Sequence, residues 1–182
     1  SPETRTMNEQ IVILSARRTP IGGFQGALSA VSAPQLGAAA ARAALADAGV
    51  SGDAVEEVIF GCVLPAGLGQ APARQAALAA GLAQSVPATT VNKMCGSGMK
   101  ALMIASDQIL AGHARLSLAG GLESMSNAPY LLLKARAGYR MGHSELIDHM
   151  FYDGLQSPWD GQAMGCFAEA TAEKYGFTRA AQ

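Results

Sequence analysis

Length, composition and charge set the first limits on what this chain does. It has 182 residues, 49% of them hydrophobic and 5% aromatic, enough for one domain or for one domain and part of another. A formal net charge of −1 without a basic run argues against nucleic-acid and membrane-surface binding, and no apolar run approaches the ~18 residues that span a bilayer. The three cysteines are widely spaced and form no CxxC pair, which predicts no disulfide framework and favours the reducing cytoplasm.

Short apolar runs alternate with helical patterns over the first two-thirds of the chain. A continuous run with β-branched residues predicts a buried first strand, and Pro34 and Gly49 bound the first helix. In chain order we expect a strand at 11–16, a helix at 34–49, a strand at 58–63, a helix at 72–80, a strand at 88–91, a helix from about 96 to 112 and a strand at 115–120. This alternation predicts an α/β fold with layered helices and sheet, and a last helix is expected at 167–175.

Several side chains in these elements have two open interpretations. Arg17 and Arg18, in the loop after the first run, either bind an anion or form a structural pair that fixes the loop. Arg74 lies near the start of a helix, where the dipole disfavours a cation. It is therefore either solvated or paired with a carboxylate of a second subunit. Cys62 lies inside an apolar strand, so we expect it in the core.

The strongest candidate for chemistry is Cys95. It follows a short strand, and Gly96, Ser97 and Gly98 let the backbone turn sharply and begin a helix. At a helix N-terminus, unpaired N–H groups and the helix dipole favour negative charge, and the thiolate is the nucleophilic form of cysteine. The competing interpretation is a small, buried and inert cysteine.

The helix after Cys95 is expected to be buried and to hold this cysteine rigidly. Its larger apolar residues recur at helical spacing, with alanines between them. The face predicted to be buried consists of Met99, Leu102, Met103, Ser106, Ile109 and Leu110.

Four kinds of chemistry are conceivable for the stretch around Cys95. Residues 96–101 match the dinucleotide pattern G-x-G-x-x-A, with Glu123 as a ribose acid, but the preceding strand is polar and a cysteine occupies the tight turn. A papain-like protease would need a Cys–aromatic pair and a downstream His and Asn. A metal site is not expected, because the histidines have no ligand-like spacing. Acyl transfer is the fourth: Cys95 could attack a thioester carbonyl while its own N–H helps to hold the oxyanion.

Four blocks of the sequence resemble the N-terminal half of a thiolase (acetyl-CoA acetyltransferase), in the order found in that family. They are SARRTPIG at 15–22, GQAPARQAA at 69–77, VNKMCGSGMKA at 91–101 and GGLESMSNAPY at 120–130. The resemblance covers nearly all of residues 8–182. It implies that Cys95 is the acyl-accepting nucleophile and that residues 69–77 lead to a dimer interface.

The resemblance also implies an organisation into domains. Residues 7–126 would be an N-terminal α/β domain, and residues 127–182 the first part of an inserted loop domain that contacts coenzyme A. Residues 1–6 carry no pattern and precede Met7, so we interpret them separately, as a leftover of recombinant expression. In that loop domain, Leu155 and Met164 would pack on the pantetheine or adenine part of CoA. Acyl-CoA and acetyl-CoA would be substrates, with no covalently bound cofactor. Residues 130–141 fall where many members build a tetramer contact, so a homodimer or homotetramer is expected.

Two departures from the family pattern shape the expected activity. Ala163 stands where many thiolases carry a histidine. The resemblance implies that this difference affects the acyl-chain preference and the contacts to the thioester, and does not exclude activity. The family's second half supplies a Gly-His-Pro histidine that activates the nucleophile and a cysteine that acts as base, and these 182 residues contain neither. We therefore expect little or no turnover from the isolated polypeptide, and a non-catalytic associating half is the alternative function. A ketoacyl synthase, which shares the fold, is disfavoured by residues 92–98 and by the block after the fourth strand.

Overall fold

The chain forms two compact units. A computed structural model describes residues 10–182, and the division between the units falls after Asn127. The expression leftover predicted at residues 1–6 lies outside the described residues. The first unit is a layered α/β arrangement, and the second is smaller and built from residues 128–182.

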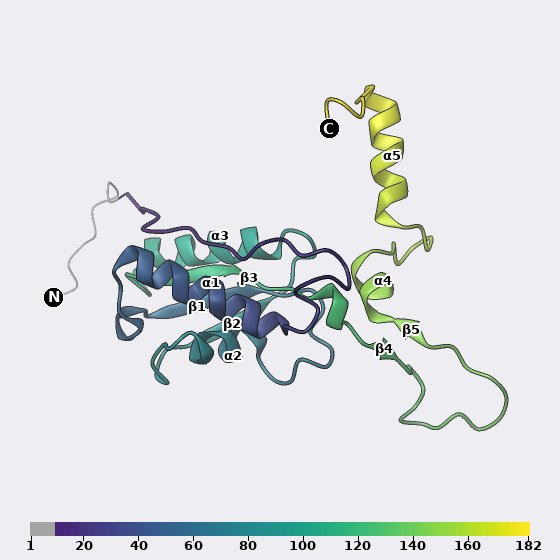
Figure 1. The fold of residues 1–182 in the computed structure, drawn as a ribbon, viewed down its shortest axis with the longest axis horizontal. Helices are drawn as coiled ribbons and strands as arrows, with labels where there is room; N and C mark the ends of the chain where they lie inside the picture. The colour runs from purple at the N-terminus through teal and green to yellow at the C-terminus, as the bar shows by residue number, and fades with distance from the viewer. Residues whose placement is uncertain (1–9) are drawn as a thin grey trace. The chain divides into compact units, whose positions relative to one another are not determined.

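A three-stranded parallel sheet forms the centre of the first unit (Figure 1). Strand β1 (Glu57–Gly61) lies in the middle, flanked by β2 (Ala88–Val91) and β3 (Ser117–Gly121). Gly61 is level with Val91 on one side and with Gly121 on the other, so the three strands end at the same edge of the sheet. The carboxyl edge of such a sheet is where the following loops and helices bring side chains together.

Helices cover both faces of this sheet. Helix α1 (Ala33–Ala48) and helix α2 (Pro72–Ala79) pack together on one face, and α3 (Ser97–Leu110) packs on the other. Short 3-10 turns occur at Gly52–Ala54 (η1) and Met125–Asn127 (η2). The prediction of an α/β layered fold is confirmed, and the helices and the later strands lie within a few residues of their predicted bounds.

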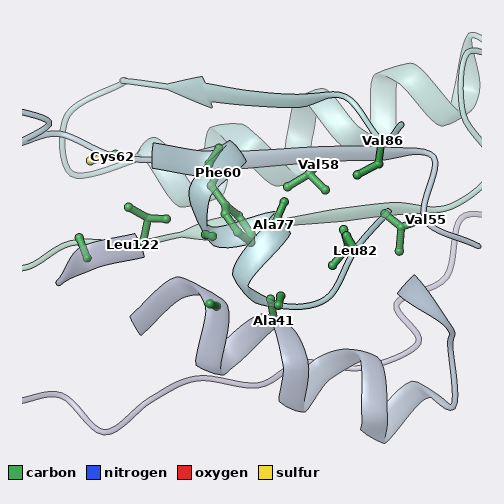
Figure 2. Packing of buried hydrophobic residues seen from close by; sticks show 14 residues of the cluster. Ala41, Val55, Val58, Phe60, Cys62, Ala77, Leu82, Val86 and Leu122 are labelled. Atoms are coloured by element: carbon green, nitrogen blue, oxygen red, sulfur yellow. The ribbon is translucent and has the colours of Figure 1, made fainter. Parts of the chain in front are cut away.

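The core is divided between the two faces of β1. Val58, Phe60 and Cys62 point toward α1 and α2 and join a larger apolar cluster, shown in Figure 2. Ile59 points the other way and packs with Ala101 and Ala105 of α3. A strand buried on both faces explains why β1 reads as a continuous apolar run instead of an alternating one. The prediction that Cys62 belongs to the core is confirmed, since only 1% of its surface is exposed.

Local sequence signals fix both ends of α1. The Ser32 hydroxyl accepts a hydrogen bond from the Gln35 N–H, and the Gln35 side chain accepts one from the Ser32 N–H, which completes a capping box. Pro34 lies in the first turn, where its missing N–H is not needed. Gly49 ends the helix in the left-handed conformation, with φ 64°.

The first predicted strand, at 11–16, is wrong. These residues form no strand, and Ile11, Val12, Ile13 and Leu14 expose between 39% and 72% of their surface. A continuous apolar run is compatible with a buried strand, but a strand also needs an open edge to pair with, and the three-stranded order of this sheet does not include the run. The pattern of apolar residues alone does not show whether a partner strand is available.

The predicted inner face of α3 is also wrong. Helix α3 buries Ser97, Ala101 and Ala105, while Met99 and Met103 are 72% and 53% exposed. Of the other residues predicted to be buried, Leu102 and Leu110 are exposed, and Ser106 and Ile109 are half-buried. The helix approaches the sheet so closely that only small side chains fit between them. The alanine face therefore packs inward and the larger apolar face points outward.

The arginines find partners within the first unit. Arg17 forms an ion pair with Asp47, which agrees with the structural interpretation of that loop. Arg74 donates hydrogen bonds to the backbone carbonyls of Val86 and Gln84, at 2.5 and 2.6 Å. Arg74 is therefore neither the solvated side chain nor the partner of a second subunit's carboxylate that the sequence suggested. Its guanidinium is bound by backbone carbonyls of the same chain.

The second unit contains little regular structure. Strands β4 (Tyr130–Leu131) and β5 (Ile147–Asp148) pair antiparallel, and helices α4 (His149–Gly154) and α5 (Met164–Tyr175) follow. The last helix begins three residues before its predicted start at 167. None of the helices that the structure describes is long and apolar enough to cross a membrane.

Candidate functional site

Cys95 lies at the carboxyl edge of the parallel sheet, between β2 and α3. Strand β2 ends at Val91, and Gly96 is the N-cap of the helix, so the cysteine directly precedes the helix start. Its side chain is exposed. The sequence prediction for its position is therefore confirmed, and the competing interpretation of a small buried cysteine is not. An exposed thiol at a helix N-terminus has both access to an electrophile and a favourable direction of the helix dipole.

Glycines let the first turn of α3 dock directly against the ends of β1 and β3. A Cβ atom on Gly61 would lie 2.5 Å from the carbonyl carbon of Ser97 and 2.7 Å from the nitrogen of Gly98. Real Cβ atoms do not come this close to backbone. On the β3 side, a Cβ on Gly121 would lie 3.4 Å from the Cα of Gly98. We call these three glycines, Gly61, Gly98 and Gly121, the glycine seat of α3.

Side chains on both sides of Cys95 fix the turn that carries it. The Ser97 hydroxyl accepts from the Lys93 N–H at 2.9 Å and donates to the Met94 carbonyl at 2.6 Å, and the Ser97 side chain is buried. The Asn92 Oδ1 atom accepts from the Met94 N–H at 2.9 Å. Met94 itself has a φ of 49°, in the left-handed region that a non-glycine residue rarely occupies. The hydrogen bonds on either side therefore hold Met94 in a conformation that it would otherwise leave.

Glu123 ties the segment after β3 to the segment after β1. Its carboxylate accepts from the Val63 N–H at 2.8 Å and from the Leu64 N–H at 3.0 Å, and the Cys62 sulfur lies 3.6 Å away. Glu123 is thus engaged with backbone of this chain, which argues against its role as the ribose acid of the dinucleotide alternative. Burial, and then the neighbouring Glu123 carboxylate, raise the pKa of the Cys62 thiol to about 12. Cys62 is therefore a neutral, enclosed thiol, in contrast to the exposed Cys95.

Sequence reasoning did not assign roles to Asn92, to Gly61, or to the Ser97 hydroxyl. Gly61 carries one usable signal: it lies inside the strand predicted at 58–63, and a glycine inside a strand often marks the close approach of another backbone. Asn92 and Ser97 are common turn formers, so their presence beside Cys95 carries no specific information without the fold.

In the second unit, Leu155 and Met164 are brought together. The Met164 N–H donates to the Leu155 carbonyl at 2.8 Å, and a bridge between Gln156 and Ala163 closes the loop between them. Both predicted CoA-contacting residues therefore lie at the base of one closed loop, where α4 ends and α5 begins. Ala163, at the position where many thiolases have histidine, is the N-cap of α5 and supplies no side-chain cap. Cys95 belongs to the first unit.

In the part of the chain that the structure describes, no cluster of three or more His, Cys, Asp and Glu side chains is placed to hold a metal ion. The third cysteine, Cys166, is exposed in the first turn of α5, where its N–H donates to the Ala163 carbonyl at 2.9 Å.

Comparison with known proteins gives matches over nearly the whole chain. Residues 11–182 match the family model "Thiolase, N-terminal domain". The chain is 52% identical to an acetyl-CoA acetyltransferase of Cupriavidus necator, over 94% of this chain and 44% of the relative. It is 50% identical to a mitochondrial acetyl-CoA acetyltransferase of Xenopus tropicalis, over 98% and 42%, and 49% identical to an acetyl-CoA acetyltransferase of Saccharomyces cerevisiae, over 97% and 45%.

The matches cover nearly all of this chain but only part of each relative. The chain spans less than half the length of each of these relatives, while the family model covers it from residue 11 to residue 182. The chain therefore belongs to the thiolase family and carries its N-terminal domain.

Proposed function

We propose that Cys95 accepts an acyl group from an acyl-CoA thioester, in a transferase of the acetyl-CoA acetyltransferase type. One observation carries the proposal: an exposed cysteine directly precedes a helix whose first turn is seated against the carboxyl edge of a parallel sheet. The names of the relatives support the substrate class, because they are acetyl-CoA acetyltransferases. Coenzyme A enters as part of the substrate, without a tightly bound cofactor.

The first step is a transthioesterification at Cys95. The Cys95 thiolate attacks the thioester carbonyl, a new C–S bond forms to the enzyme, and the C–S bond to coenzyme A breaks. Coenzyme A leaves as a thiolate and takes up a proton. The hydrogen bonds of the Ser97 hydroxyl and of Asn92 hold the backbone on either side of the nucleophile, which limits the entropy lost when it reaches the carbonyl.

The second step is a Claisen condensation. A second acetyl-CoA, deprotonated at its α-carbon, attacks the acyl–Cys95 carbonyl and releases the Cys95 thiolate, and the product is a 3-ketoacyl-CoA. Thiolysis is the reverse reaction. By the resemblance, the histidine that activates the thiol and the cysteine that removes the α-proton belong to the family's second half. We therefore propose that a polypeptide of these 182 residues alone is acylated slowly and does not complete the cycle.

Acetylation of the purified chain by acetyl-CoA tests this proposal. We expect one acetyl group on the peptide that contains Cys95, detected by mass spectrometry after digestion. Cys95→Ser should abolish it. Cys166→Ser is the matched control, because Cys166 is also exposed but lies on a different helix. Equal acetylation of the two cysteines, or none on Cys95, would contradict the proposal, and multiple turnovers of acetoacetyl-CoA thiolysis by the chain alone would contradict its second part.

We also propose that the chain associates with a second copy of itself through the outward face of α3, a surface other than the segments at 69–77 and 130–141 where the resemblance implies dimer and tetramer contacts. The outward face of α3 supports this, because it exposes Met99, Met103 and Leu110 by 72%, 53% and 64%. An apolar surface of this kind on a helix is typical of an interaction site. Met103→Lys should lower the sedimentation-equilibrium mass toward that of one chain, whereas Ile21→Lys, at an exposed loop position, should not. A monomeric wild-type chain would refute association.

A further inference from the structure

The hydrogen bonds of the Glu123 carboxylate to the Val63 and Leu64 N–H groups, which we call the Glu123 clamp, connect to a further side chain, Asn92. The Glu123 Oε1 atom accepts from the Leu64 N–H at 3.0 Å. That N–H belongs to the same peptide group as the Val63 carbonyl, which in turn accepts from the Asn92 Nδ2 atom at 3.5 Å. A charged acceptor on the N–H side of a peptide group polarises it and strengthens the carbonyl as an acceptor.

The Asn92 amide continues this connection to the turn of the nucleophile. Its Nδ2 side donates to Val63, and its Oδ1 side accepts from the Met94 N–H at 2.9 Å. The two bonds fix which way the amide faces, because the reversed amide would oppose donor to donor and acceptor to acceptor. Met94 directly precedes Cys95 and has the left-handed φ of 49°. The connection therefore ends on the strained residue beside the thiol.

We infer that Glu123 and Asn92 are positioning residues for Cys95, linked through the Val63–Leu64 peptide group. The inference rests on the proposed function, since it concerns the reactivity of the nucleophile. Neither side chain contacts the Cys95 sulfur in any hydrogen bond of the described residues, so their effect is on the conformation of the turn. Removing the charge of Glu123 weakens the hold on Asn92, and Met94 then leaves the left-handed region more often.

Glu56 offers a matched control at the opposite edge of the same strands. Its carboxylate accepts from the Arg115 N–H at 2.7 Å and from the Arg115 side chain, and so ties the start of β1 to the start of β3. Glu123 and Glu56 thus join the same two strands at their opposite ends. Glu56→Gln removes a comparable carboxylate without touching the turn of Cys95. If both variants slow the acetylation of Cys95, the cause is the loss of the tie between β1 and β3. If only Glu123→Gln slows it, the cause is the position of the turn that carries Cys95.

Two measurements on the full chain test the link. The first is amide hydrogen exchange at Met94, which does not require acyl transfer. Glu123→Gln should increase its exchange rate about tenfold, since a charge-assisted bond is lost at the far end. Exchange of the Lys100 N–H, which bonds to Gly96 within α3, should stay unchanged. Glu56→Gln should leave both amides as they are. Unchanged exchange at Met94 in Glu123→Gln overturns the inference.

The second measurement is single-turnover acetylation of Cys95 over a range of acetyl-CoA concentrations. Glu123→Gln and Asn92→Ala should each lower the maximal rate constant about tenfold while the half-saturating concentration stays the same, because positioning affects the reaction and not the binding. The double variant should lose no more than the larger single loss, since both changes break one connection. Asn92 is exposed, so its replacement keeps the fold.

The outcomes separate this inference from the proposed function. If Cys95 of the wild-type chain takes no acetyl group, the proposed function fails, while hydrogen exchange still decides whether Glu123 holds the turn. If Cys95 is acetylated and the two losses add fully in the double variant, or Glu56→Gln slows acetylation equally, the inference fails and the proposed function stands. Non-additive losses together with faster exchange at Met94 support both.

Discussion

Replacing Gly61 by alanine probes the feature on which the position of Cys95 depends. The added Cβ would lie 2.5 Å from the Ser97 carbonyl carbon, 2.6 Å from the Ser97 Cβ and 2.7 Å from the Gly98 nitrogen. Carbon atoms in contact lie about 3.5–4.0 Å apart, so the start of α3 must move by roughly 1 Å. Overpacking of this size typically costs about 3 kcal/mol. For a unit of this size, that loss lowers the midpoint of thermal unfolding by roughly 10 °C.

Gly98→Ala is the matched control in the same seat. The nearest atom to its added Cβ would be the Gly121 nitrogen at 3.6 Å, an ordinary contact distance. We expect its stability to stay within about 1 kcal/mol of the wild type, because alanine is also the better helix former. Urea and thermal unfolding followed by circular dichroism measure both variants, and acetylation of Cys95 measures the shift of the turn. If Gly61→Ala unfolds within about 0.5 kcal/mol of the wild type, the seat does not fix the helix as argued.

Three further predictions concern other parts of the first unit. The Cys62 thiol should resist alkylation at pH 9 until the chain is unfolded, because burial raises its pKa to about 12. The contribution of the protonated thiol to the free energy of unfolding is complete below pH 9.0, the ordinary pKa of a thiol, and is lost as the pH rises from there toward the raised pKa of about 12. Modification of Cys62 in the folded chain, mapped by mass spectrometry, would contradict its enclosure. Hydrogen bonds from the Arg115 N–H and guanidinium lower the pKa of Glu56, so its stabilisation is present above about pH 4.5 and is lost as the pH falls through the lowered pKa. Glu56→Gln should therefore flatten the acid limb of a stability–pH curve, and an unchanged limb would argue against the pair. Ser32→Ala should destabilise the chain by about 1 kcal/mol through loss of the α1 capping box, whereas an equal loss in Ser29→Ala, outside the box, would show that the cap is not the cause.

The helix boundaries and the place of Cys95 could be predicted because they depend on local chemistry. Pro34 and Gly49 bound α1 through backbone preferences that hold in any fold. In the same way, glycines after Cys95 indicate a turn into a helix. The family resemblance implies an acyl-accepting role for the cysteine, whereas the spacing alone is also compatible with an inert thiol.

The failures share one physical cause, which is that they depend on the position of a second element. Helix α3 has an alanine face and a larger apolar face with the same period, and only the close approach at Gly61 decides that the alanine face packs inward. The run at 11–16 satisfies the composition of a strand but pairs with none. The sequence offers Glu123 as a ribose acid only within the disfavoured dinucleotide alternative, and only the fold shows that its carboxylate accepts from the Val63 and Leu64 N–H groups.

The seat of α3 has a consequence for how the site is assembled in time. Its parts come from the end of β1, the start of α3 and the end of β3, and the Glu123–Val63 contact closes over sixty residues of chain. Such long-range closures form late in folding, because the entropy of the intervening chain must be lost first. A nascent or truncated chain that ends before β3 therefore contains the cysteine and its helix but neither the second wall of the seat nor the Glu123 clamp. The native conformation of the turn that carries Cys95 thus requires that the whole sheet has formed.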